Sequence, residues 1–409
     1  MNHLKLLSIA LLTLIFTSSN CGDDKGNNTN TNQPDILPPV ETSEPNTDYK
    51  PAFEGQTRIN GAKTETQYEI KVIAEGLNKP WGITTLPDGQ LLITEKRGAL
   101  LIVNPDGTVS EPIYGFPEVD DRGQGGLLDV APSPNFDKDR LIFFTLAEMT
   151  KQGSLTAVGK GRLSNDERSI EDFQIIFRAI PYFDNSMHFG SRIVFDKSGN
   201  IFVSTGERSD LSTRPKAQLL DNGYGKVVHI TTDGNPVADN PFINTPNALP
   251  EIYSYGHRNP QGLAMHPQTN ELWMSEMGPR GGDELNLIKP GKNYGWATIT
   301  YGIEYNGNPV GEGKTIDEAM EQPIYYWDPV LSPSGMSFYN SDIIPEWQNN
   351  LFIGGLNSKH IARLIIVDNK VVGEERLLSD ENQRFRDITD HNNGSIYAIT
   401  DEGRLYKIG

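Results

Sequence analysis

Cysteine and long apolar segments are nearly absent from this 409-residue chain, whose only cysteine is Cys21. A single cysteine excludes an intrachain disulfide framework and any zinc site made of several cysteines. No apolar run reaches the roughly 18 residues that a membrane-spanning helix requires. We therefore expect no integral membrane domain.

Positive charge is scarce as well: 36 lysines and arginines face 54 aspartates and glutamates, which gives a formal net charge of -18. Nucleic acid and anionic lipid surfaces are polyanions that would repel such a chain, so neither is an expected partner. Glycine and proline are abundant, with 40 and 27 copies, and both interrupt helices. The length allows one large domain or two ordinary ones with a sizeable core.

Residues 1–20 have the features of an export signal peptide. Lys5 supplies a positive start, and residues 6–16 form an apolar run that is too short to span a membrane. Small residues then precede Cys21, which resembles a bacterial lipoprotein signal in which this cysteine is lipidated and becomes the mature N-terminus. The alternative is an ordinary secreted protein with a free cysteine.

Residues 21–67 are rich in Asn, Thr, Asp, Pro and Glu and lack apolar periodicity. Such a composition predicts a flexible linker. We expect this linker to hold the following domain off a lipid surface, so that the protein is an exported lipoprotein of the cell envelope, facing the periplasm or the exterior. Contact with the membrane would then be made only through the lipidated N-terminus.

Residues 68–409 repeat one pattern six times, in which an apolar alternation leads to a polar turn and a more apolar strand follows. The copies begin near residues 81, 127, 193, 263, 336 and 388. Units of about four strands at such periods are typical of a β-propeller, whose blades bury their apolar faces only against neighbouring blades. A β-sandwich is the competing fold, but it would not reuse one motif six times.

The sequence therefore predicts an all-β fold, a six-bladed β-propeller of four-stranded blades over residues 68–409. The early apolar segment 68–73 precedes the first copy of the repeat. We expect it to complete the last blade and close the ring.

Polar and cationic residues framed by glycine come directly before several repeats, at positions that converge on one rim of a propeller's central channel. They are Gln124, His188, Arg258, Asn259, Arg384 and Arg386. Three arginines on one rim are out of character in a chain of net charge -18. Because guanidinium groups pair with carboxylates bidentately, this rim suits a planar anionic ligand that carries carboxylates.

His188 is the best general-base candidate on this rim, because a neutral imidazole can take up a proton near neutral pH. The alternative is a structural histidine that bonds loop carbonyls. The segment 277–284 would expose backbone carbonyls in a turn, and Asp283 and Glu284 add hard oxygens that suit calcium. A solvated acidic turn is the alternative there.

Seven stretches of the chain resemble the soluble aldose sugar dehydrogenases that use pyrroloquinoline quinone (PQQ), the soluble glucose dehydrogenase family. They are GQGGLLDV (123–130), HFGSRIVFD (188–196), YSYGHRNPQGLAMHP (253–267), EMGPRGGDELN (276–286), GKNYGW (291–296), SGMSFYNSD (334–342) and RFRD (384–387). All seven occur in collinear order, and the resemblance is strongest to the bacterial aldose sugar dehydrogenase branch.

The resemblance implies a role for each matching residue. His188 would take the proton from the sugar C1 hydroxyl, and Arg258 would polarise the quinone C5 carbonyl that accepts the hydride. The residues implied to line the cofactor are Gln124, Arg258, Asn259, Tyr305, Arg384 and Arg386. The carbonyls of Gly278 and Pro279 would bind a calcium ion that also binds PQQ, and Glu284 and Tyr294 would mark a further calcium position. Calcium would act as a Lewis acid and an orienting clamp.

One position departs from the family pattern. The family usually has a PQQ-contacting lysine in the fifth blade, where this chain has Asn357, with Lys359 two residues further on. Either Lys359 reaches back to the cofactor, or one cationic contact is lost.

The implied function is PQQ- and calcium-dependent oxidation of aldose sugars at C1 to the lactone, with an unidentified electron acceptor. A calcium-dependent, lactonase-like propeller hydrolase is an alternative, but it would need carboxylates on the channel axis, where this rim offers Arg, Gln, His and Asn. A non-catalytic surface propeller is the other alternative. His188 and the Arg258-Asn259 pair argue against it, whereas Asn357 in place of lysine argues for it.

Overall fold

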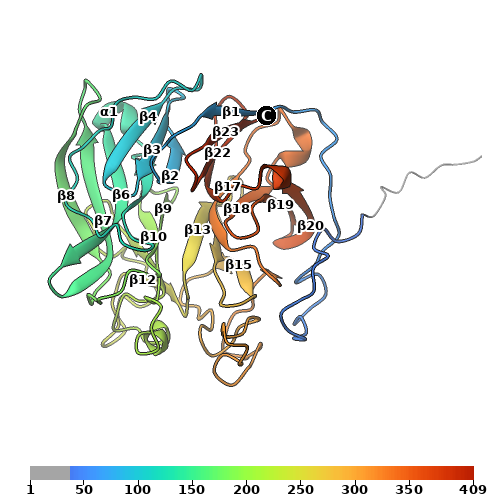
Figure 1. Ribbon diagram of the computed structural model, residues 1–409. Coiled ribbons are helices and arrows are strands. Elements are labelled where there is room, and N and C mark those ends of the chain that lie inside the picture. Colours follow the sequence, from blue (N-terminus) through green and yellow to red (C-terminus); the bar gives the residue numbers. More distant parts are fainter. Residues whose placement is uncertain (1–36) are drawn as a thin grey trace, which may run out of the picture. The chain divides into compact units, whose positions relative to one another are not determined.

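The computed structural model describes residues 37–409, in which 23 β-strands form six antiparallel sheets (Figure 1). Each sheet is one blade, and the predicted six-bladed β-propeller is confirmed. The predicted signal peptide and Cys21 lie outside the described residues. No helix in residues 37–409 is long and apolar enough to cross a membrane.

The blades follow one another in chain order. The first three contain β2 (Pro80–Thr85), β3 (Leu91–Glu95) and β4 (Ala99–Val103); β5 (Leu127–Pro132), β6 (Leu141–Thr150), β7 (Gly153–Leu163) and β8 (Ile170–Arg178); and β9 (Gly190–Phe195), β10 (Ile201–Thr205), β11 (Lys226–Ile230) and β12 (Ile252–Tyr255). The last three contain β13 (Pro260–Met265), β14 (Leu272–Glu276), β15 (Asp283–Ile288) and β16 (Tyr325–Trp327); β17 (Pro333–Phe338), β18 (Leu351–Gly355), β19 (Ile361–Val367) and β20 (Lys370–Leu377); and β21 (Phe385–Asp390), β22 (Ile396–Thr400) and β23 (Leu405–Ile408) with β1 (Ile70–Ala74). The helices are short: α1 (Phe136–Asp139) and the 3-10 helices η1 (Arg214–Gln218), η2 (Pro345–Trp347) and η3 (Ser379–Glu381).

In five of the six blades the second strand is mainly apolar and buried along its length, because neighbouring blades cover both of its faces. Strands β3, β10, β14, β18 and β22 are buried at every position. A strand with one solvated face would instead alternate between apolar and polar residues. The core therefore lies between the blades, and polar residues are left for the channel.

The first blade has three named strands instead of the four that were expected. Where the fourth would lie, Ile113 forms an isolated bridge: Leu100 N donates to Ile113 O at 3.0 Å, and Ile113 N donates to Leu100 O at 2.8 Å. Pro112 and Pro117 flank this bridge. A proline cannot donate to a ladder, so the pairing does not extend into a strand.

Strand β1 closes the ring, as predicted for the segment 68–73. It pairs antiparallel with β23, from Ile70 opposite Ile408 to Ala74 opposite Leu405. The last blade therefore has the order β1-β23-β22-β21 and joins an early strand to the final one. This pairing covers an edge of β23 that would otherwise expose unpaired backbone groups.

Residues 37–67, which we call the N-terminal strap, differ from the flexible linker expected for residues 21–67. Gln56 is fully buried. Its side-chain Nε2 donates to Pro323 O at 2.9 Å, and its backbone carbonyl oxygen accepts from Tyr326 N at 2.9 Å. Trp347 Nε1 donates to Thr64 Oγ1 at 2.7 Å. Polar strap residues therefore find partners on the blades instead of in water, and Figure 1 shows the strap beside the blade of β20.

Candidate active site

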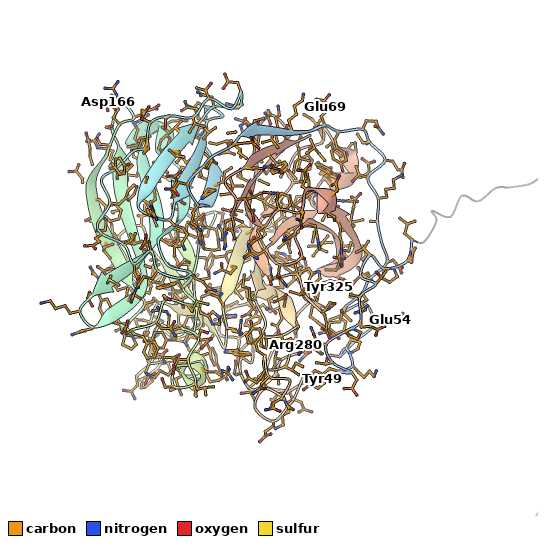
Figure 2. The ribbon with its side chains drawn as sticks, viewed as in Figure 1. Tyr49, Glu54, Glu69, Asp166, Arg280 and Tyr325 are labelled. Carbon is orange, nitrogen blue, oxygen red and sulfur yellow. The ribbon has the colours of Figure 1, made fainter. Side chains whose placement is uncertain are left out.

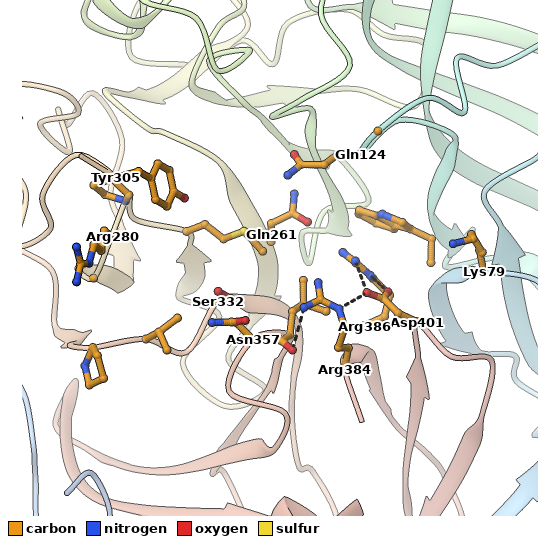
Figure 3. A pocket seen from close by; sticks show the side chains of 18 of the residues that line it. Lys79, Gln124, Gln261, Arg280, Tyr305, Ser332, Asn357, Arg384, Arg386 and Asp401 are labelled. Atoms are coloured by element: carbon orange, nitrogen blue, oxygen red, sulfur yellow. Dashed lines mark hydrogen bonds and ion pairs between the residues drawn. The ribbon is translucent and has the colours of Figure 1, made fainter. Parts of the chain in front are cut away.

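A cavity of about 710 Å³ opens at the rim that carries the starts of the innermost strands (Figure 3). Five of the residues predicted to contact a cofactor line it: Gln124, Tyr305, Asn357, Arg384 and Arg386. They come from segments far apart in the sequence, such as the loop before β5 and the start of β21. Three of the six rim residues that the repeats predicted, Gln124, Arg384 and Arg386, thus line one cavity, and the resemblance supplied Tyr305 and Asn357.

Positive charge dominates the cavity lining. The charged side chains there are Lys79, Lys96, Arg280, Arg384, Arg386 and Asp401. Arg386 Nε lies 2.7 Å from Asp401 Oδ1, and Arg384 Nε lies 2.9 Å from Asp401 Oδ2 (Figure 3). Burial alone would raise the pKa of Asp401, but the two guanidinium groups hold it below its ordinary value. One ionised carboxylate thus faces five cations, which leaves an excess of positive charge for an anionic ligand.

His188 is buried next to the cavity. Its backbone N–H donates to Gln124 Oε1 at 2.8 Å, and its Nδ1 lies 2.7 Å from Oε1 of the buried Glu207. Burial first, and the charge of Arg258 second, lower the pKa of His188 to about 4, so its imidazole is neutral near neutral pH. With Nδ1–H donating to Glu207, Nε2 is the nitrogen left to accept a proton.

Glu207 is the site residue that the sequence reasoning missed. It follows Gly206, whose Cα approaches the chain at His188 so closely that a Cβ would lie 2.2 Å from the His188 carbonyl oxygen. Glycine is therefore required there. A glycine and a carboxylate directly after the buried strand β10 were the signal that could have located this residue.

Arg258 and Asn259 are buried and are not among the residues that line the larger cavity in the described part of the chain. Arg258 Nη1 donates to Met277 O at 3.0 Å, its guanidinium lies 5.2 Å from the Trp296 ring, and its Nε is buried without a partner. Asn259 Oδ1 accepts from Gly190 N at 3.1 Å. A buried N–H without a partner is costly, which makes Arg258 a candidate donor to a ligand.

Three of the four predicted metal residues meet in a second, small cavity of about 10 Å³. Gly278, Glu284 and Tyr294 line it together with Glu276, whereas Pro279 lines the larger cavity. Within residues 37–409, no group of three or more His, Cys, Asp or Glu side chains could hold a metal ion by itself. A metal here would therefore also need backbone carbonyls.

The donor atoms around this small cavity fit calcium. Asn286 Nδ2 lies 3.1 Å from Glu276 Oε1 and 3.1 Å from Glu284 Oε2, while its Oδ1 is buried without a partner. Burial, and then the charge of Glu276, raise the pKa of Glu284 well above its ordinary value. The two buried carboxylates are hard donors, and a divalent cation would neutralise them.

Asp283, considered above as a calcium ligand, instead accepts hydrogen bonds from backbone N–H groups. Its Oδ1 accepts from Gly278 N at 2.9 Å, and its Oδ2 accepts from Leu331 N at 2.8 Å and Ser332 N at 2.7 Å. The hydroxyl of Tyr294 is also engaged, because it donates to a backbone carbonyl at 2.6 Å. Neither side chain is left free for a metal.

Asn357 and Lys359 are separated by the structure. Asn357 lines the larger cavity, whereas Lys359 is not among the lining residues of the described chain and its Nζ donates to Asn382 Oδ1 at 3.0 Å in an exposed place. Of the two alternatives from the sequence, the structure therefore favours the loss of one cationic contact.

A buried charge cluster forms the floor of the cavity. Arg192 Nη1 lies 2.6 Å from Asp387 Oδ2 and 3.2 Å from Asp129 Oδ1, and its guanidinium lies 4.2 Å from the ring of Trp81. Trp81 lines the cavity, while Arg192 and both aspartates line a hollow of about 410 Å³ at the opposite ends of the innermost strands. The cluster therefore separates the two mouths of the channel.

Comparisons with known proteins place the chain among sugar dehydrogenases. The sequence model of a family described as glucose / sorbosone dehydrogenase matches residues 77–407. An aldose sugar dehydrogenase of Escherichia coli is 44% identical over 344 residues, which cover 83% of this chain and 92% of that protein. Quinoprotein glucose dehydrogenase B of Acinetobacter calcoaceticus is 26% identical, in a match that covers 83% of this chain and 86% of that protein.

Two solved structures show the same fold. The soluble aldose sugar dehydrogenase of Escherichia coli in its apo form is 43% identical, with a TM-score of 0.81 over 84% of this chain and 99% of that one. The PQQ-bound form of an aldose sugar dehydrogenase from Streptomyces coelicolor is 26% identical, with a TM-score of 0.70 over 85% and 99%.

Proposed function

Because the chain belongs to the glucose / sorbosone dehydrogenase family, an oxidoreductase family, we propose that it oxidises aldose sugars at C1 to the lactone, using PQQ and calcium. The observation that carries the proposal is the cationic cavity next to the neutral imidazole of His188. The PQQ-bound structure of the Streptomyces coelicolor relative supports PQQ as the cofactor.

The cavity lining fits PQQ, which is planar and carries three carboxylates. Arg384 and Arg386 present guanidinium groups, and Gln124 and Asn357 present amides. Guanidinium groups recognise carboxylates with planar, charge-assisted hydrogen bonds. Bound PQQ supplies a two-electron acceptor that receives the hydride from the sugar C1.

His188 is the proposed general base. Its Nε2 accepts the proton of the sugar C1 hydroxyl, because Nδ1 is occupied by Glu207 at 2.7 Å. Glu207 then lies beside a cationic imidazolium, and its Oε2, buried without a partner, adds a second acceptor near that charge. The buried carboxylate therefore fixes the tautomer before the reaction and stabilises the charge that forms during it.

Arg258 and the metal residues complete the proposed site. The unpartnered Nε of Arg258 is the candidate donor to the cofactor. Glu276, Glu284 and the carbonyl of Gly278 are the proposed calcium ligands on this chain, with Pro279 facing the larger cavity. Calcium would supply positive charge and an orienting contact.

The two other functions fit less well. A lactonase-like hydrolase would use side-chain carboxylates on the channel to hold its metal, but the only acidic side chain in the lining of the described chain's larger cavity is Asp401, which pairs with Arg384 and Arg386. A non-catalytic surface propeller would give no reason for a buried, neutral histidine paired with a carboxylate beside a cationic cavity.

Reconstitution tests the proposed function. PQQ and calcium are added to the purified protein, the quinone absorbance is recorded, and D-glucose and other aldoses are then added. We expect oxidised PQQ to bind and to be reduced when an aldose is added, with calcium more effective than magnesium, because magnesium demands a tighter octahedron. A bound quinone whose spectrum no aldose changes would reject the dehydrogenase.

We also propose that the protein is exported as a lipoprotein anchored through Cys21, as its lipoprotein-like signal indicates. Replacement of the only cysteine, Cys21→Ser, should move the protein from the membrane fraction to the soluble fraction. An unchanged distribution between the fractions would reject the lipid anchor.

A further inference from the structure

The N-terminal strap contributes to the cavity although it lies outside residues 77–407, the part of the chain that the family model matches. Its residue Asn46 is part of the cavity lining, next to Arg280 and Gly281 of the turn after β14. Figure 2 shows Tyr49 of the strap and Arg280 on the same side of the molecule. A segment that was expected to be a spacer therefore forms part of the wall.

The propeller holds Asn46 firmly in this place. Its backbone N–H donates to Asp328 Oδ1 at 2.9 Å, and its Nδ2 donates to the same oxygen at 3.0 Å and to Pro329 O at 2.9 Å. Arg58, further along the strap, donates to Asp328 O at 2.8 Å. Both amide hydrogens of Asn46 are thus used, and its Oδ1 is left to face the cavity turn.

Asn46 Oδ1 accepts a hydrogen bond from Arg280 Nε at 3.0 Å. Within residues 37–409 this is the only hydrogen bond of the Arg280 side chain, so its terminal N–H groups remain free in the cavity wall. Arg384 and Arg386 differ, because both are tied to Asp401.

Arg280 belongs to a wall that it shares with Tyr305. Its backbone pairs with Ile303, with Arg280 N to Ile303 O at 2.9 Å and Ile303 N to Arg280 O at 3.1 Å. Tyr305, two residues further on, also lines the cavity and is 73% exposed. Both side chains are therefore open to a molecule that enters the cavity.

We propose that Asn46 is a positioning residue for sugar binding: it holds Arg280 so that the free guanidinium N–H groups meet the hydroxyl groups of the aldose at the cavity mouth. This inference rests on the proposed function. An arginine side chain loses considerable conformational entropy when it becomes ordered. The hydrogen bond to Asn46 already orders Arg280 in the sugar-free protein, so this part of the entropy cost does not oppose sugar binding. His188 is held by Gln124 and Glu207 and not by Asn46 or Arg280, so Asn46 should affect sugar affinity and not the chemical step.

Steady-state kinetics of the PQQ-loaded Asn46→Ala variant with D-glucose test the proposal. We expect KM to rise about threefold to tenfold and kcat to stay within about twofold, the pattern for a lost contact that is equal in ground state and transition state. Arg280→Ala should also raise KM, and adding Asn46→Ala to it should raise KM no further, because the two residues act through one contact.

Thr66→Ala is the matched control. It removes another strap hydrogen bond, from Thr66 Oγ1 to Glu346 Oε2 at 2.7 Å, and neither residue lines the cavity. We expect its KM to equal that of the wild type. An unchanged KM in Asn46→Ala, or an equal rise in Thr66→Ala, would overturn the role of Asn46.

Direct binding separates this inference from the proposed function. D-glucose is titrated into the wild type and into Asn46→Ala without PQQ, and the fluorescence of the tryptophans, of which Trp81 lines the cavity, is recorded. Weaker binding to the variant supports the inference even if the wild type oxidises no aldose and the proposed function fails. Equal binding to both, or no binding to the wild type, overturns it.

Discussion

Among single residues, His188 is the one on which turnover should depend most, because its Nδ1 is held by Glu207 at 2.7 Å and its Nε2 is free to accept a proton. We predict that His188→Gln lowers aldose turnover by at least about 10²-fold, the usual contribution of a general base. PQQ affinity should change little, since residue 188 contacts Gln124 through its backbone N–H. Steady-state kinetics and a PQQ titration measure the two quantities.

His229→Gln is the control for that variant. His229 is also buried and lies 3.0 Å from a carboxylate oxygen of Asp196, but it belongs to β11 and does not line the cavity of the described chain. Its turnover should equal that of the wild type. Full turnover of a PQQ-loaded His188→Gln protein would remove His188 from the mechanism.

The fifth blade allows a second test with single residues. Asn357→Lys should tighten PQQ binding by about tenfold to a hundredfold, because a hydrogen bond to a charged group contributes about 1.5–3 kcal/mol. Lys359→Ala should leave PQQ affinity unchanged, since the Lys359 Nζ donates to Asn382 at 3.0 Å. Titrating PQQ into both variants decides between the positions. A loss of affinity in Lys359→Ala would show that Lys359 reaches the cofactor.

At the scale of strands and loops, local sequence patterns identified the blades but not the strap. Strands such as β3 and β18 are buried at every position because two neighbouring blades cover them, and their runs of apolar residues leave a pattern in the sequence itself. Gln56 and Thr64 of the strap are polar, and their partners Pro323 and Trp347 are 267 and 283 residues away. No local pattern reveals a partner at that distance.

The residues of the site can likewise be divided into those that local sequence predicts and those that depend on distant contacts. Gln124, Arg384 and Arg386 were predictable because the repeat places them on one rim. The contact of His188 with Glu207 and that of Asn46 with Arg280 depend on tertiary structure, and neither follows from spacing. The resemblance to a family supplied the roles of the predicted residues, but a strap outside the matched region could not come from it.

Strand β1 is the element whose loss tests the closure of the ring. A chain that begins at residue 76 lacks β1 and leaves the edge of β23 unpaired, whereas a chain that begins at residue 68 keeps β1 and lacks only the strap. We expect the shorter chain to unfold at a temperature at least about 5 °C lower than the longer one, because several ladder bonds are lost and an edge is exposed. Thermal unfolding followed by circular dichroism measures this. Equal midpoints would mean that β1 does not hold the ring closed.

For the molecule as a whole, all six blades meet in the charge cluster below the cavity. The contributing residues, in blade order, are Trp81, Asp129, Arg192, Gln261, Gly335 and Asp387. One guanidinium faces two carboxylates there, so the charges balance when the two aspartates share one proton. Burial is the main reason that the pKa of Asp129 is raised and that of Asp387 is raised from 3.8 to about 7.

This shared proton makes stability depend on pH. Between about pH 4 and pH 7 the folded protein keeps a proton that the unfolded chain has lost, so the free energy of unfolding should fall as the pH rises, by up to about 1.4 kcal/mol per pH unit. Asp387→Asn removes one of the two titrating carboxyl groups and should remove this contribution. The unfolding temperature of Asp387→Asn should therefore increase relative to that of the wild type as the pH rises through this window.

Thermal unfolding of the wild type and of Asp387→Asn across the same pH range gives the difference between their midpoints. The other titrating groups are the same in both proteins, so their contributions cancel in this difference. The exposed Asp166 provides the control, because Asp166→Asn removes an equal charge from the surface and should leave the slope in this window unchanged. If the curves of wild type and Asp387→Asn run parallel, Arg192 stabilises both carboxylates as ions, and the centre of the propeller carries a net negative charge at neutral pH. If they diverge as expected, the six blades are joined around a neutral centre, and alkaline pH should weaken their association.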